Sequence, residues 1–221
     1  MEPSNYGTYL VTQESLSDGR STLEVVEAAV TGGVDVVQLR EKGTDTRWRY
    51  DLGLEVREVT AAADVDLIVN DRVDVATAID ADGVHVGQSD LPVSVARELL
   101  GPEAVIGCSA STVAEAEAAE ADGANYLGVG SIYGTTSKDV PEPEDDVGPD
   151  RVAEIAEAVS IPIVGIGGVT AENAGSVIEA GAVGVAVISE ITAADDPAAA
   201  TDALASSVER TKRKANERSR R

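Results

Sequence analysis

Short apolar runs alternate with longer amphipathic segments along the whole chain. The apolar runs are rich in Val and Ile, which is typical of strands in a parallel sheet that is buried on both faces. The segments between them repeat apolar residues at helical spacing, which predicts helices with one face on the sheet. The expected strands are Thr8–Thr12, Asp35–Arg40, Asp66–Asn70, Gly83–Gly87, Ala104–Ser109, Tyr126–Gly130, Pro162–Ile166 and Gly184–Ser189.

The helices expected between these strands include Thr22–Val30, Val93–Leu100, Thr112–Ala121, Val152–Val159 and Ala171–Ala180. Thr112 and Thr170 each precede a helical pattern and are expected to cap it. Eight consecutive strand–helix units favour a closed (β/α)8 barrel over an open doubly wound sheet. We therefore expect one α/β domain over residues 1–207, followed by a basic tail over residues 208–221 that ends the last helix or is disordered.

The net charge of the chain limits the classes of partner that it could bind. The chain has 17 Lys and Arg against 40 Asp and Glu, a net charge of −23, and seven of the basic residues lie in the tail. The strongly acidic part of the chain before the tail repels nucleic acid and anionic membranes. The tail lacks aromatic residues for base stacking, so a solvated terminus is favoured over a nucleic-acid patch. Abundant acid with little Lys and no Phe resembles proteins of salt-loving archaea, although ordinary solubility is an alternative reading.

The sequence has no basic leader and no apolar run of the roughly 18 residues that a membrane span needs. We expect a cytoplasmic protein without a membrane partner. Its single cysteine, Cys108, excludes an internal disulfide, and its apolar surroundings favour a packed, inert thiol over a functional one.

The few cations in the body mark candidate anion sites. Lys42 and Lys138 are the only lysines before the tail, and both follow predicted strands. Gln38, Arg40 and Lys42 alternate along the second strand and share one face. Because a guanidinium can grip phosphate with two bonds while an ammonium adds a point charge, the row suits a polyphosphate. The alternative is that the strand ends early and these residues are in water.

Two carboxylates follow adjacent strands. Asp71 comes after the third predicted strand and Asp90 after the fourth. Such a pair suits Mg²⁺, which typically binds one or two carboxylates together with substrate phosphates. The competing interpretation is that each aspartate caps the helix that follows it. His85, inside the fourth strand, is expected to be a hydrogen-bonded structural residue rather than a catalytic one.

Later strands end in hydroxyl and glycine residues. Ser109 ends the fifth strand, and the loop after the sixth carries Thr135, Thr136, Ser137 and Lys138, which could form a mobile cover or merely a turn. The glycines around Gly168 after the seventh strand, with Ile188 and Ser189 at the end of the eighth, occupy the usual place of a barrel phosphate site.

The segments QLREK, VND, HVGQSD, CSAST, GSIYGTTSK, VGIGGVT and VAVIS occur in this order. The ordered set resembles the thiamine-phosphate synthase family along nearly the whole chain. The resemblance implies a Mg²⁺-dependent transferase that joins hydroxymethylpyrimidine diphosphate to thiazole phosphate and releases pyrophosphate. It implies that the pyrimidine diphosphate is held by Gln38, Leu39, Arg40, Glu41, Lys42, Asn70, Ser109 and Lys138. It implies that the thiazole phosphate is held by Thr135, Thr136, Ser137, Gly168, Ile188 and Ser189.

By the same resemblance, Asp71 and Asp90 would ligate Mg²⁺, and Arg40, Lys42 and Lys138 would neutralise the departing pyrophosphate. The sequence departs from the family pattern at Ser111, where histidine is frequent, and at Ser131 and Gly134, where prolines are common.

Three alternatives stay open at this point: the related thiazole tautomerase, another phosphate-handling barrel enzyme of sugar or tryptophan biosynthesis, and a non-catalytic ligand-binding barrel. The sequence also leaves the oligomeric state open, including a homo-oligomer.

Overall fold

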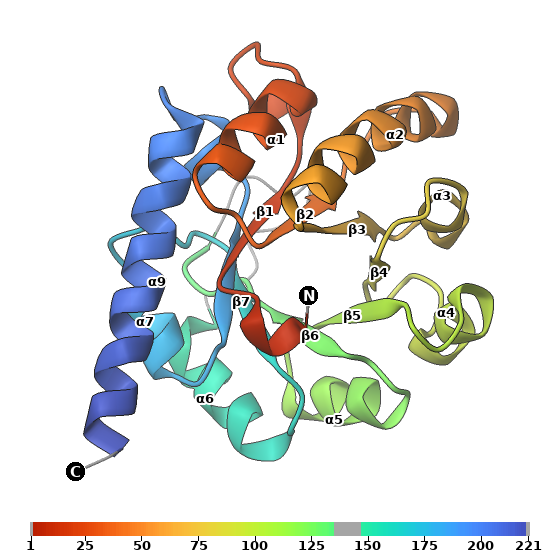
Figure 1. The fold of residues 1–221 in the computed structure, drawn as a ribbon. Coiled ribbons are helices and arrows are strands. Elements are labelled where there is room, and N and C mark those ends of the chain that lie inside the picture. The colour runs from red at the N-terminus through yellow and green to blue at the C-terminus, as the bar shows by residue number, and fades with distance from the viewer. Residues whose placement is uncertain (1, 135–146, 220–221) are drawn as a thin grey trace.

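The computed structural model describes residues 2–134 and 147–219 of the chain. Within this part, eight parallel strands pair in sequence order, and β8 pairs with β1 to close a barrel (Figure 1). The strands are β1 Thr8–Val11, β2 Val36–Leu39, β3 Asp66–Asn70, β4 Gly83–Val86, β5 Val105–Ala110, β6 Tyr126–Val129, β7 Ile163–Ile166 and β8 Gly184–Val187. The (β/α)8 barrel expected from the sequence is confirmed.

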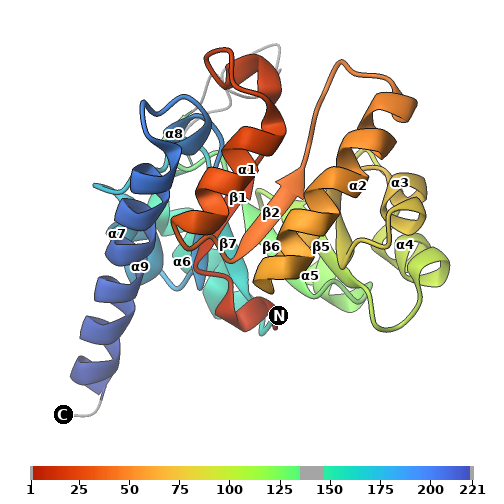
Figure 2. The ribbon, with the colours of Figure 1, turned by 45° about the horizontal axis from the view of Figure 1, so that its top comes forward.

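Helices surround the strands, and Figures 1 and 2 show them as an outer ring. They are α1 Thr22–Thr31, α2 Thr46–Ala63, α3 Val73–Ala78, α4 Val93–Leu100, α5 Val113–Ala121, α6 Gly148–Ala158, α7 Ala174–Glu179, α8 Ser189–Thr192 and α9 Pro197–Ser219. Single 3₁₀ turns at Pro3–Asn5 and Glu14–Leu16 flank β1. Within the described ranges, no helix combines the length and the apolar character that crossing a membrane requires.

Each predicted strand begins within one residue of the observed strand, but the predicted end at Ser189 is wrong. β8 stops at Val187, and Ile188 turns out of the extended conformation with a ψ of −86°. Ser189 instead begins the short helix α8. The sequence around Ile188 carries no turn signal, so its apolar pattern predicts a strand that continues past the observed end at Val187.

Side-chain alternation divides the interior into two apolar layers. On β1, Leu10 points into the layer between strands and helices, whereas Tyr9 and Val11 join the cluster inside the barrel. The aromatic rings of Tyr6, Tyr9 and Tyr126 pack inside the barrel with centroids 5.6 to 6.1 Å apart. Their tilted and edge-on arrangement is the one that aromatic rings prefer.

Two glycines make room for these rings. A Cβ at Gly107 would overlap the Tyr126 ring and crowd Nδ1 of His85. A Cβ at Gly128 would lie 2.9 Å from Cε1 of His85. The narrow barrel therefore accepts large polar rings only because neighbouring strand positions carry no side chain.

The basic segment continues the last helix. α9 begins at Pro197 and runs without a break to Ser219, packing against α1 and α7. In Figure 2 its end extends past the barrel. Arg218 Nη1 lies 3.7 Å from Glu179 Oε1 on α7, and both side chains are exposed, so this ion pair contributes little stability.

One of the two expected threonine caps is confirmed. The Thr112 hydroxyl accepts a bond from the Glu115 N–H, and the Glu115 carboxylate accepts one from the Thr112 N–H, which forms a capping box for α5. The expected cap at Thr170 is wrong, because a turn intervenes and α7 begins only at Ala174. There the Thr170 N–H donates to Asn173 Oδ1 at 2.8 Å.

We predict that Thr112→Ala lowers the free energy of unfolding by about 1 kcal/mol, the usual cost of losing an N-cap side chain. Thr170→Ala is the matched control and should change it by a few tenths of a kcal/mol at most, since Thr170 caps no helix. Urea unfolding of the two variants measures the difference. Equal losses in the two variants would contradict the assignment of the cap.

Candidate active site

A cavity of about 60 Å³ opens inside the barrel at the carboxyl ends of the strands. Most of the strands contribute side chains or backbone to its wall. Its lining is Tyr9, Val11, Gln38, Arg40, Asn70, His85, Ser109, Tyr126, Gly128, Val164, Ile166, Ala186 and Ile188. The cavity thus gathers four of the polar residues that the sequence placed at strand ends, namely Gln38, Arg40, Asn70 and Ser109.

A chain of hydrogen bonds crosses the cavity floor. Gln38 Nε2 donates to the Tyr9 hydroxyl at 2.8 Å, and the Tyr9 and Tyr126 hydroxyls are 2.8 Å apart. The Tyr126 hydroxyl lies 3.1 Å from His85 Nδ1, and His85 Nε2 lies 2.9 Å from the Ser109 hydroxyl. Side chains from β2, β1, β6, β4 and β5 are therefore fixed relative to one another before any ligand binds.

The tyrosines in this chain act as neutral groups. Burial raises the pKa of Tyr126 and of Tyr9 well above the usual value for a phenol. Both hydroxyls stay protonated throughout the physiological range and can donate hydrogen bonds. The sequence expectation for His85 was a hydrogen-bonded structural role, and both of its ring nitrogens do have partners.

The cationic row of β2 divides between two environments. Arg40 is almost fully buried, and its Nη1 donates to Gln13 Oε1 at 3.0 Å. Lys42 is half exposed, and its Nζ lies 3.6 Å from Asp71 Oδ2 on the loop after β3. The alternative that this row lies in water is wrong for Gln38 and Arg40, which are both buried.

Two residues alternate with Gln38, Arg40 and Lys42 along the chain, namely Leu39 and Glu41, and their side chains face away from the cavity. Leu39 packs in the outer apolar layer against the helices. Glu41 is buried and accepts hydrogen bonds from the Thr22 hydroxyl at 2.6 Å and the Glu14 N–H at 2.8 Å. Their side chains hold the loop after β2, so any contact they make with a ligand would come from the backbone.

Asp71 and Asp90 are neighbours. Burial raises the pKa of Asp71, the adjacent Asp90 carboxylate raises it further, and Lys42 lowers it. The alternative that they cap helices is wrong, since the residues at the N-caps of α3 and α4 are Arg72 and Pro92. Among the described residues, no group of three or more His, Cys, Asp or Glu side chains could hold a metal ion.

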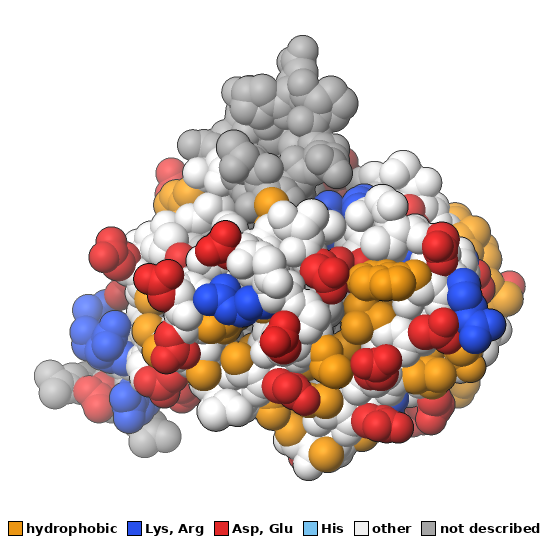
Figure 3. All heavy atoms as spheres, turned by 90° about the horizontal axis from the view of Figure 1, so that it is seen from above, with side chains coloured by type: hydrophobic (Ala, Val, Ile, Leu, Met, Phe, Trp, Pro, Cys, Tyr) orange, Lys and Arg blue, Asp and Glu red, His pale blue; other side chains and the backbone are white. Residues whose placement is uncertain are grey.

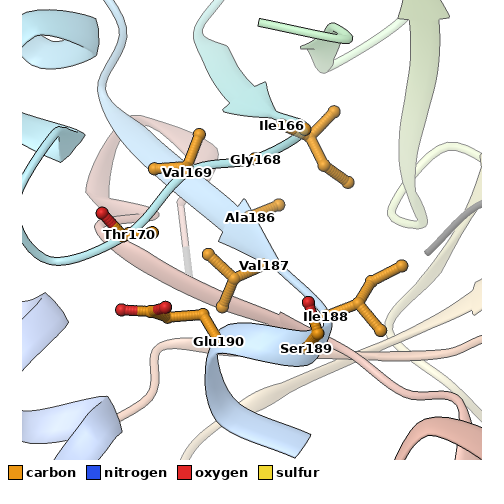
Figure 4. A pocket seen from close by; sticks show the side chains of 10 residues that line it. Ile166, Gly168, Val169, Thr170, Ala186, Val187, Ile188, Ser189 and Glu190 are labelled. Atoms are coloured by element: carbon orange, nitrogen blue, oxygen red, sulfur yellow. The ribbon is translucent and has the colours of Figure 1, made fainter. Parts of the chain in front are cut away.

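A second pocket, of about 100 Å³, lies between the loop after β7 and the start of α8 (Figure 4). Gly167 and Gly168 line it with φ angles of +103° and +61°, which favour glycine, and Ile188 and Ser189 line the opposite side. Glu190 also borders this pocket, and its carboxylate accepts a bond from the Ala171 N–H at 3.0 Å. The structure describes three of the residues predicted to hold the thiazole phosphate, Gly168, Ile188 and Ser189, and all three line this pocket.

The remaining predicted residues of this half, Thr135, Thr136 and Ser137, lie outside the described residues, as does Lys138.

Ser111, one departure from the family pattern, donates from its hydroxyl and its N–H to the Glu115 carboxylate at the start of α5. Ser131, another, is buried beside Gly167, and its hydroxyl has no hydrogen-bond partner among the residues that the structure describes.

Sequence reasoning missed Tyr9, Tyr126 and Gln13. The two tyrosines occupy inward positions of β1 and β6, and strand parity combined with their polar hydroxyls could have revealed them. Gln13 follows β1 in an irregular loop, and no periodic signal marks it. Cys108 agrees with expectation, because it is buried and burial raises the pKa of its thiol to about 11.

The direction of the hydrogen-bond chain predicts the state of His85, the only histidine in the sequence. If the donation that starts at Gln38 continues through both tyrosines, Tyr126 donates to Nδ1 and the imidazole is neutral with its proton on Nε2. The His85 Nε2–H then donates to Ser109. NMR of ¹⁵N-histidine-labelled protein should show this single tautomer at pH 7.

Tyr126→Phe removes the donor to Nδ1 and should shift His85 towards the other tautomer. Tyr6→Phe is the matched control, because the Tyr6 hydroxyl donates to Asp66 at 2.6 Å and is outside the chain. An imidazole protonated on Nδ1 in the unsubstituted protein would contradict the assigned direction.

Comparison with known proteins identifies the family to which the chain belongs. The family model for thiamine monophosphate synthase matches residues 8–191. A thiamine-phosphate synthase of Haloarcula marismortui is 62% identical over 206 residues, covering 93% of this chain and 98% of the relative. The corresponding protein of Haloquadratum walsbyi is 59% identical over 202 residues, covering 91% of each chain.

Among solved structures, a thiamine phosphate pyrophosphorylase of Pyrococcus furiosus superposes with a TM-score of 0.85 at 38% identity, covering 95% of this chain and 98% of that one. A 3-hexulose-6-phosphate synthase at 18% identity and a TM-score of 0.66 shares the fold alone. The family match over most of the barrel and the high identity of these relatives show that the chain belongs to the thiamine-phosphate synthase family, whose members are transferases of thiamine biosynthesis.

Proposed function

We propose that the chain condenses 4-amino-2-methyl-5-hydroxymethylpyrimidine diphosphate with 4-methyl-5-(2-phosphoethyl)thiazole to give thiamine phosphate and pyrophosphate. The carboxylated form of the thiazole would give the same products with additional loss of CO2. The observation that carries this proposal is that Lys42, two residues after the buried Arg40, lies 3.6 Å from Asp71, which is paired with Asp90, in a chain with a net charge of −23. Fixed cations next to a carboxylate pair suit a ligand that combines a polyanion with a divalent metal.

The central cavity takes the pyrimidine in this proposal. Gln38, Asn70 and Ser109 supply amide and hydroxyl groups for the ring and its exocyclic amine, and the diphosphate extends towards Arg40 and Lys42. Lys138, which lies outside the described residues, belongs to the same group of cations. The main support is that the three residues proposed to contact the pyrimidine ring line the same cavity as Arg40.

The residues present fit a magnesium ion. Asp71 and Asp90 offer carboxylate oxygens. Burial and the adjacent Asp90 carboxylate both raise the pKa of Asp71, and a bound cation would relieve the repulsion between the two carboxylates. When bound, the ion would neutralise charge on the diphosphate. Asp90 Oδ2 also accepts the Gly87 N–H at 2.8 Å, which orients this carboxylate.

The second pocket takes the thiazole phosphate. Gly168, Ile188 and Ser189 border it, and short barrel helices such as α8 present backbone N–H groups to phosphates. Thr135, Thr136 and Ser137 complete this half in the proposal. Ile166 and Ile188 line both pockets, so the two substrates would meet across these apolar side chains.

The proposed chemistry needs charge stabilisation and alignment rather than a base. Departure of pyrophosphate leaves a pyrimidine-methyl cation, and the thiazole nitrogen attacks it with its own lone pair. Arg40, Lys42 and Lys138 stabilise the departing anion, and the rigid hydrogen-bond chain from Gln38 to Ser109 fixes the ring for attack.

A direct assay tests the reaction. The protein is incubated with Mg²⁺ and both substrates at low and molar KCl, and thiamine phosphate and pyrophosphate are measured, with each substrate omitted in turn. Equal amounts of the two products, formed only in the complete mixture, are expected. Failure to form either product at every salt concentration would reject the proposal.

Removal of either carboxylate tests the metal site. Asp71→Asn or Asp90→Asn should raise the Mg²⁺ concentration needed for half-maximal rate by at least about tenfold, because an amide binds the ion more weakly than a carboxylate. Asp74→Asn is the matched control, since Asp74 borders the same surface hollow but pairs with Arg72. An unchanged Mg²⁺ requirement in both site variants would place the ion elsewhere.

We also propose that the acidic surface is an adaptation to high salt. Figure 3 shows acidic side chains spread over the face in view, with basic ones in a few separate places. The net charge of −23 implies strong self-repulsion, which salt screens. The melting temperature should therefore rise between about 0.1 M and about 3 M KCl. A melting temperature independent of KCl would contradict this adaptation.

A further inference from the structure

Gln13, in the loop after β1, forms a saturated set of hydrogen bonds. It is only 8% exposed. Its Oε1 accepts from Arg40 Nη1 at 3.0 Å and from the Lys42 N–H at 3.3 Å. Its Nε2 donates to the Ser15 hydroxyl at 3.0 Å and to the Lys42 carbonyl at 3.4 Å. Every donor and acceptor position of the amide is therefore engaged.

These bonds replace the sheet ladder where it ends. β2 stops at Leu39, so the backbone that carries Arg40 and Lys42 continues beyond the strand. The Thr12 hydroxyl accepts the Arg40 N–H at 3.1 Å, and the side chain of the next residue, Gln13, binds both the N–H and the carbonyl of Lys42. The end of β1 thus holds the end of β2 through side chains.

The same amide also fixes a guanidinium. Arg40 is buried, and its Nη1 donates to Gln13 Oε1 at 3.0 Å. The Gln13 oxygen is a neutral acceptor, so it orients the guanidinium without adding a negative charge beside it. A single buried side chain therefore contacts both the guanidinium of Arg40 and the backbone that carries Lys42.

We propose that Gln13 is a positioning residue for the diphosphate, holding Arg40 and Lys42 in their anion-binding arrangement before the substrate arrives. This inference rests on the proposed function. It assigns to a residue outside the predicted motifs the preorganisation on which electrostatic stabilisation of the leaving group depends. No contact between Gln13 and the substrate is required.

The test is Gln13→Met, which keeps the length and bulk of the side chain but removes its hydrogen bonds. Binding of inorganic pyrophosphate in the presence of Mg²⁺ is measured by calorimetry. We expect the Kd to rise at least about fivefold, as for the loss of one hydrogen bond to a charged group. The KM for the pyrimidine diphosphate should rise while the KM for the thiazole phosphate stays unchanged.

Asn125→Leu is the matched control at the opposite end of the barrel. Asn125 Oδ1 accepts from a guanidinium, Arg97 Nη2 at 2.6 Å, and from a backbone N–H, Ile106 at 2.8 Å. It repeats the bonding of Gln13 away from the site, so Asn125→Leu should lower the melting temperature and leave the pyrophosphate Kd unchanged.

If Gln13→Met lowers the melting temperature but binds pyrophosphate like the unsubstituted protein, Gln13 is merely structural and the inference is overturned. If Gln13→Met does not fold, Gln13→Asn takes its place. It keeps a polar amide but is too short to reach Arg40 and Lys42 together, so the same rise in Kd is expected and an unchanged Kd again overturns the inference. Formation of thiamine phosphate by the unsubstituted protein, measured in parallel, separates failure of this inference from failure of the proposed function.

Discussion

Closure of the barrel is the constraint on which the rest of the structure depends. Pairing of β8 with β1 brings all strand carboxyl ends to one mouth and leaves an interior only wide enough for side chains. Tyrosine rings occupy this interior where glycines such as Gly107 give them room. Since the rings cannot move apart, the tyrosine hydroxyls and the His85 imidazole together link Gln38 on one strand to Ser109 on another.

Electrostatics then decides what this mouth can bind. Lys42 lies 3.6 Å from Asp71, which is paired with Asp90, and follows the buried Arg40 by two residues. In the proposed function the carboxylates bind a cation and the basic residues bind an anion. A magnesium diphosphate would supply both, whereas either ion alone would leave like charges close together. In a chain with net charge −23, this local arrangement would offset the repulsion that the rest of the surface imposes on a phosphorylated substrate.

Much of the fold could be predicted from the sequence, because each βα unit buries an apolar run that reads clearly as a strand. The row of Gln38 and Arg40 was predictable for the same reason, since strand parity places both inside the barrel. The turn at Ile188 and the true start of α7 were not predictable, because local turn geometry there overrides the periodic pattern. The role of Gln13 depends on contacts with residues far along the chain, and no sequence spacing reports such contacts.

The central claim of the proposed function is that Arg40 and Lys42, which follow β2, form one site for a metal-bound diphosphate together with the paired aspartates. A crystal structure of the protein with Mg²⁺ and pyrophosphate tests it most directly. The account predicts the ion between Asp71 and Asp90, with pyrophosphate oxygens contacting Arg40 and Lys42. Pyrophosphate bound instead only beside Gly168 and Ser189, with no ion at the aspartates, would contradict it.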